Sequence, residues 1–95
     1  MKYRKKPVVV EAMAFEEFIQ YGLNQPECHV VDGKPWSFKI NGRPVTHENN
    51  ECYIITTLEG SHNMTPKDML IIGVQGEAYP CKIDIFNETY EKVEG

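Results

Sequence analysis

Apolar and polar residues alternate through much of the chain, which is the pattern of half-buried β-strands. Residues 36–40 (WSFKI) alternate strictly, and Asn41-Gly42 follows directly. This dipeptide favours a two-residue type I′ turn with positive φ at both positions. We therefore predict a hairpin whose return strand covers residues 43–47, with Trp36 on the core face beside Phe38.

Runs of β-branched and aromatic residues, each bounded by turn residues, predict further strands. The nearly all-apolar run 69–74 is expected at the centre of a sheet, and Pro80 is expected to end the last strand. The remaining predicted strands cover residues 7–15, 29–31, 52–58, 61–64 and 77–80.

Two short helices complete the prediction. Residues 16–21 follow the first strand with apolar side chains at helical spacing, and Gly22 stands where a C-cap glycine belongs. Asp84 is placed to cap a final helix, in which one face carries Ile85, Phe86, Thr89 and Tyr90. The fold class is therefore α+β, mostly β: a small bent antiparallel sheet or partly open barrel with two short helices.

The length and composition indicate an ordinary globular protein. The 95 residues suit a single domain (residues 1–95), of which 41% are hydrophobic and 25% charged. The sequence contains no run of about eighteen apolar residues, so no membrane span is predicted. The apolar part of the N-terminus, residues 7–10, is too short for a signal-peptide core, so a cytoplasmic location is expected.

The charge distribution bears on nucleic-acid binding. The net charge is −4, which disfavours binding through phosphate neutralisation. Against this, the first six positions hold Lys2, Arg4, Lys5 and Lys6. Such an arm can touch a phosphate backbone, although basic flanks also keep a buried strand soluble. The hairpin of Trp36 lies beside Lys34, Lys39 and Arg43, which would suit a stacking surface for single strands.

Three cysteines without close spacing argue against a disulfide framework and against a zinc site. Cys81 lies next to Lys82 near a predicted helix start, surroundings that favour a thiolate. A nucleophile also needs a base, and no histidine is placed beside it by its spacing. We therefore interpret residues 73–86 as a structural clasp in which the Cys81 side chain faces inward.

Three carboxylates, Asp68, Glu77 and Asp84, are candidates for acid–base chemistry or a divalent cation. Each also has a local structural role: Asp68 in a turn, Glu77 after a glycine turn, and Asp84 at a helix start. The sequence contains no zinc-protease, phosphate-loop or dinucleotide-binding motif. No cofactor and no metal are predicted.

The two ends of the chain resemble a family of short phage and prophage proteins. The resemblance rests on residues 1–15 (MKYRKKPVVVEAMAF) and on the closing block 66–90, with its Gly-Val-x-Gly-Glu-x-Tyr-Pro-Cys-Lys-x-Asp-Ile-Phe element. The family usually carries Pro-Gly-Asp-aromatic, whereas this chain has Lys67 and Met69 at the second and fourth positions of that element. The resemblance does not extend to residues 20–52. The resemblance implies a phage or prophage origin, and thus a bacterial host cell, without an established activity.

Three functions follow from these observations. The first is a non-enzymatic accessory protein that binds an unidentified host or phage protein, because an acidic surface suits a basic partner. The second is a weak nucleic-acid binder, and the third a small enzyme using Cys81 or the carboxylates. No membrane partner is expected, and a homo-oligomer is compatible with the sequence. The predicted binding residues are Lys39, Arg43, Glu77, Tyr79 and Lys82.

Overall fold

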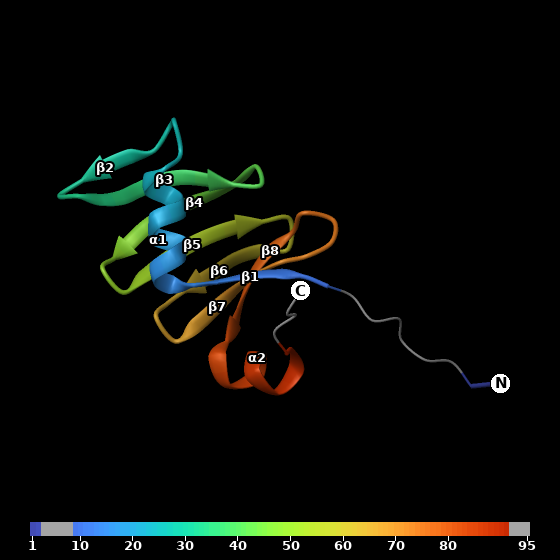
Figure 1. Ribbon diagram of the computed structural model, residues 1–95. Coiled ribbons are helices and arrows are strands. Elements are labelled where there is room, and N and C mark those ends of the chain that lie inside the picture. The colour runs from blue at the N-terminus through green and yellow to red at the C-terminus, as the bar shows by residue number, and fades with distance from the viewer. Residues whose placement is uncertain (3–8, 92–95) are drawn as a thin grey trace.

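The computed structural model describes residues 1–2 and 9–91 of the chain, which form a small α+β protein that is mostly β (Figure 1). This confirms the predicted fold class. The elements in chain order are β1 (Glu11–Ala14), α1 (Phe15–Leu23), β2 (His29–Val31), β3 (Lys34–Ile40), β4 (Arg43–Asn49), β5 (Cys52–Thr57), β6 (Gly60–Met64), β7 (Asp68–Ile72), β8 (Ala78–Lys82) and α2 (Ile83–Thr89). The predicted start of the first strand and most of the basic arm fall on residues 3–8, outside the described residues.

The strands form two antiparallel sheets, and in the described part of the chain neither closes into a barrel. One is a five-stranded meander of order β2-β3-β4-β5-β6, and the other has three strands of order β1-β7-β8. The apolar strand β7 is central in the smaller sheet, as predicted. The chain passes between the sheets at a turn in which Asp68 accepts hydrogen bonds from the backbone N–H and the hydroxyl of Thr65, at 3.0 and 2.8 Å.

The hydrophobic core lies between α1 and the two sheets, and α1 crosses over the strands (Figure 1). Phe18 of α1 is fully buried, and its ring centroid lies 5.4 Å from that of Phe38 and 5.5 Å from that of Tyr53. Leu70 and Ala78 add buried side chains from the smaller sheet. Both sheets therefore share one core, and α1 is held by burial of its apolar face.

The hairpin turn at Asn41-Gly42 has the predicted conformation, with φ of 50° and 78°. Asn41 has a second role, because its side-chain Nδ2 donates a hydrogen bond of 3.1 Å to the backbone carbonyl of Gly76. Gly76 belongs to the loop between β7 and β8. One side chain therefore shapes a turn in the larger sheet and ties that turn to the smaller sheet.

The predicted cap at Gly22 is wrong. Helix α1 continues through Leu23, and Asn24 forms the C-cap with right-handed backbone angles. Gly22 is a buried helical residue, and a Cβ there would lie 2.6 Å from Cε1 of Phe38. The glycine is required because the ring of Phe38 needs the space, not because the helix ends.

The predicted core position of Trp36 is also wrong. His29 pairs with Ser37 while Val30 pairs with Pro35, so Trp36 is an extra residue, a β-bulge, in β3. The bulge reverses which side chains face the core in the part of β3 that precedes Ser37. Pro35 is therefore buried and Trp36 is 42% exposed. The indole stacks on the imidazole of His47 at 4.5 Å with an interplanar angle of 12°.

The C-terminal elements differ from the prediction in two details. Strand β8 continues through Pro80, because β8 is an end strand and a missing donor is tolerated there. Helix α2 has Lys82 as its N-cap, so Asp84 lies in the first turn, where a carboxylate still complements the helix dipole. Phe86 is half-buried and stacks on Tyr90 at 5.2 Å. No helix in the described residues is long and apolar enough to cross a membrane.

Candidate functional site

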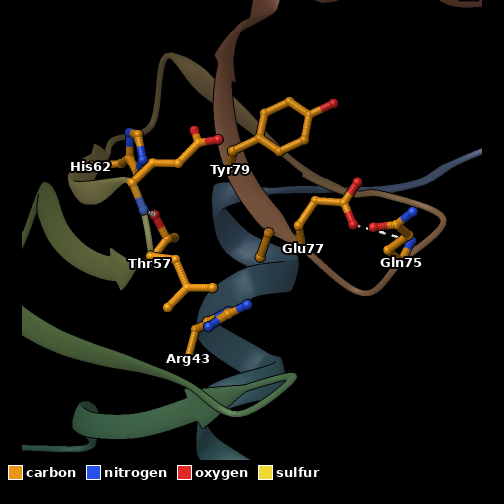
Figure 2. A pocket seen from close by; sticks show the side chains of 9 residues that line it. Arg43, Thr57, His62, Gln75, Glu77 and Tyr79 are labelled. Atoms are coloured by element: carbon orange, nitrogen blue, oxygen red, sulfur yellow. Dashed lines mark hydrogen bonds between the residues drawn. The ribbon is translucent and has the colours of Figure 1, made fainter.

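Three connections lie at one end of the molecule: the β3–β4 turn, the β5–β6 turn and the β7–β8 loop (Figure 1). A groove of about 580 Å³ opens between them, within the range of about 300–1,000 Å³ found for ligand sites. It lies where the two sheets meet. We name it the seam groove, and its lining residues are Arg43, Thr57, Leu58, Glu59, His62, Gln75, Glu77, Ala78 and Tyr79 (Figure 2).

The β7–β8 loop holds its shape through its own hydrogen bonds. The N–H of Gly73 donates to the carbonyl of Glu77 at 2.8 Å, and the N–H of Gly76 donates to the carbonyl of Gly73 at 3.0 Å. The carboxylate of Glu77 accepts the N–H of Gln75 at 3.1 Å and lies over Gly73, where a Cβ would overlap it (Figure 2). Glu77 therefore orders one wall of the groove, and its carboxylate is turned toward Gln75.

Arg43 also lines the groove, at the first position of β4 (Figure 2). Its side chain is half-buried, and in the described part of the chain no carboxylate lies within ion-pair distance of it. The one ion pair among those residues joins Lys82 to Asp68 at 3.5 Å. Arg43 thus presents to the groove a guanidinium that no ion pair among the described residues neutralises.

Two large side chains give the groove apolar surface. Leu58, at the β5–β6 turn, is 88% exposed, and Tyr79, on β8, is 37% exposed. Burial raises the pKa of Tyr79, and the neighbouring Tyr90 hydroxyl and Glu77 carboxylate raise it further. The phenol therefore stays neutral at physiological pH. Tyr79 can offer both a ring face and a hydroxyl to a ligand.

The five predicted binding residues are not all brought together. Arg43, Glu77 and Tyr79 line the seam groove, whereas Lys82 ion-pairs with Asp68 at the far end of β8. Lys39 lines a separate groove of about 410 Å³ beside Pro26, Pro44 and Thr46. Sequence reasoning missed Leu58, His62 and Gln75. Of these, only Leu58 had a signal: an apolar residue directly before the Glu59-Gly60 turn, where burial is difficult.

The cysteine thiols contact the backbone. Each thiol donates a hydrogen bond to the carbonyl of the next residue, at 3.7 Å for Cys28, 3.8 Å for Cys52 and 3.6 Å for Cys81. Burial raises the pKa of the Cys28 thiol, partly offset by a hydrogen bond from the Trp36 backbone. Within residues 1–2 and 9–91, no three metal-ligating side chains are grouped together.

Comparison of the chain with models of protein families, with curated proteins and with solved structures finds no match. The resemblance to phage proteins thus stays an interpretation of residues 1–15 and 66–90. The groove itself combines an ordered loop, an exposed leucine and an arginine that has no ion pair among the described residues, and it lies where the two sheets meet.

Proposed function

We propose that the protein is a non-enzymatic binding module of a phage or prophage, acting in the bacterial cytoplasm, and that it holds a segment of a partner protein in the seam groove. The observation that carries the proposal is the exposed side chain of Leu58 beside the guanidinium of Arg43. Protein interfaces combine an apolar anchor with a rim of polar groups, and arginine and tyrosine are enriched in them.

The scaffold supports this function. The groove is formed by turns and by a loop, and these project from two sheets that share a buried core. Binding residues are often carried on loops that a rigid scaffold positions. The internal hydrogen bonds of the β7–β8 loop hold one wall in place before a partner arrives, which reduces the entropy lost on binding.

A pull-down from bacterial lysate, with and without nuclease and read by mass spectrometry, tests the proposal. The wild-type protein should retain a specific protein with nuclease present. Leu58→Asp should lose that protein, because a charge replaces the apolar anchor. Val30→Asp is the matched control, since Val30 is an exposed apolar residue of β2, outside the groove. Equal capture by the wild type and both variants would contradict the proposal.

The exposure of Trp36 favours a second candidate function, weak binding of single-stranded nucleic acid. An exposed indole can stack on a base. Trp36 is the one tryptophan of the chain, so its fluorescence reports directly on such binding. Four phosphate contacts would give a salt slope of about −3 on single strands. Nanomolar affinity at physiological salt would place this function above protein binding.

A further inference from the structure

We infer that the seam groove recognises an extended protein segment that carries one carboxylate, and that Arg43 binds this carboxylate. The inference rests on the proposed function and names the chemistry of the partner. Its starting point is Arg43, a half-buried residue whose guanidinium has no ion pair among the described residues. A guanidinium offers a planar fork of donors that matches a carboxylate, and such charge-assisted pairs are stronger than neutral hydrogen bonds.

Neither of the two carboxylates that line the groove forms an ion pair with Arg43. The carboxylate of Glu77 is held by the N–H of Gln75 and by its contact with Gly73. Glu59 lies in the β5–β6 turn, and its carboxylate is not within ion-pair distance of Arg43. Both would repel a second acidic group on the ligand. The groove therefore suits a single acidic position, not a generally acidic segment.

The position of the groove favours an extended ligand. It lies between β6 and β8, which are end strands of their respective sheets. End strands present backbone N–H and C=O groups to which an extended segment can add as a further strand. His62 lies on β6, and Leu58 just before it can pack against an apolar side chain of that segment. Backbone pairing would give affinity, and Arg43 would give selectivity.

The carboxylate can belong to an aspartate or glutamate side chain or to the C-terminus of the partner. Two libraries of displayed random nonapeptides separate these sources. In one library the random segment ends the chain with a free carboxylate, and in the other a fixed tail follows it. Each is selected on immobilised wild-type protein, on Arg43→Gln and on Lys39→Gln. Lys39→Gln removes the same charge from the same sheet at a residue outside the groove.

On the wild type and on Lys39→Gln, we expect enriched peptides with one acidic position or with a required free C-terminus. Replacing that carboxylate by an amide should weaken binding about tenfold or more. Arg43→Gln should remove the preference, while its circular dichroism and melting temperature stay those of the wild type. If Arg43→Gln does not fold, Arg43→Lys replaces it and should reduce the acidic preference without abolishing it.

Enriched peptides without a carboxylate preference would overturn the inference and leave the proposed function standing. An acidic preference that Arg43→Gln retains would also overturn it. Failure of the wild-type protein to enrich any peptide in either library would contradict both the inference and the proposed function.

Discussion

Helices α1 and α2 are both short, both follow a strand, and both carry aromatic residues at helical spacing, yet they are held in different ways. Helix α1 buries Phe18 and Gly22 completely in the shared core. Helix α2 has no buried residue, and its aromatic contact is the stack of Phe86 on Tyr90 within the same segment. The same sequence pattern thus gives a core helix at one end of the chain and a surface helix at the other.

The difference lies in what each helix finds opposite its apolar face. Helix α1 meets the aromatic side chains of the five-stranded meander, where Phe38 and Tyr53 enclose Phe18. Helix α2 follows β8 directly and lies mainly against β7 and β8. Amphipathic spacing shows that a helix has an apolar face, but it does not show how much of that face the rest of the protein will bury.

The largest expected effect is that of Phe18→Ala. The side chain is fully buried among three aromatic rings, so its removal leaves a cavity and should lower the free energy of unfolding by about 3–5 kcal/mol. Urea unfolding followed by circular dichroism measures this. A loss no larger than that of Phe86→Ala would remove the distinction between the two helices.

Gly22→Ala comes next. Alanine is the better helix former by about 1 kcal/mol, but its Cβ would lie 2.6 Å from Cε1 of Phe38. We expect the overpacking to outweigh the propensity and to destabilise the protein by about 1–3 kcal/mol. Gln20→Ala, on the exposed side of the same helix, should change stability by no more than about 0.5 kcal/mol. Stabilisation by Gly22→Ala would show that Phe38 moves away at little cost.

Alkaline pH should weaken the region around α1. Burial, and secondarily the nearby Cys28, raise the pKa of Tyr53. The folded protein then keeps a proton that the unfolded chain releases near pH 10, so stability present below that pH is lost as pH rises. The slope is at most about 1.4 kcal/mol per pH unit for this group. Unfolding in urea between pH 8 and pH 11 measures it.

The matched variants Tyr53→Phe and Tyr79→Phe separate the two regions in that experiment. Tyr53→Phe loses the hydrogen bond of 2.8 Å to the carbonyl of Pro35, which costs about 1 kcal/mol, but it should flatten the alkaline decline. Tyr79 also has a raised pKa but is more exposed, so Tyr79→Phe should flatten the decline less. The reverse order would mean that the smaller sheet governs alkaline stability.

Of the two phenylalanine truncations, Phe86→Ala is expected to have the smaller effect. Its ring is half-buried and stacks on Tyr90, so the variant should lose only about 1 kcal/mol, well below the cost of removing a core aromatic residue. The free energy of unfolding from the same urea experiment decides this. A loss of about 3 kcal/mol or more would show that α2 is as strongly integrated as α1.

Local rules predicted much of the fold. Turn chemistry identified Asn41-Gly42, and composition identified the central strand β7. The errors at Gly22 and Trp36 have a common cause: the environment of each residue is set by a segment outside its own helix or strand. Gly22 makes room for Phe38, and Trp36 is displaced by a bulge against β2. Neither the partner nor the bulge leaves a periodic signal in the sequence.

The candidate site was only partly predictable for the same reason. Glu77 and Tyr79 stood out because they lie in a dense motif, and Arg43 because it follows a hairpin turn. Whether these side chains come close to one another depends on how the two sheets pack. The alternation of apolar and polar residues carries no information about that packing. Lys39 and Arg43 were grouped as basic residues beside the aromatic hairpin, whereas in the structure they line different grooves.

The bond from Asn41 to Gly76 has a consequence for protein engineering. Judged by turn statistics alone, glycine at position 41 is a harmless exchange, since a type I′ turn accepts Gly-Gly as well as Asn-Gly. Here the exchange would keep the hairpin but remove a hydrogen bond between two sheets whose strands come from distant parts of the chain. Redesigning each loop separately, by turn statistics alone, would thus loosen the contact between the two sheets that form the groove. Asn41 must be retained for a contact 35 residues away, not for the turn in which it lies.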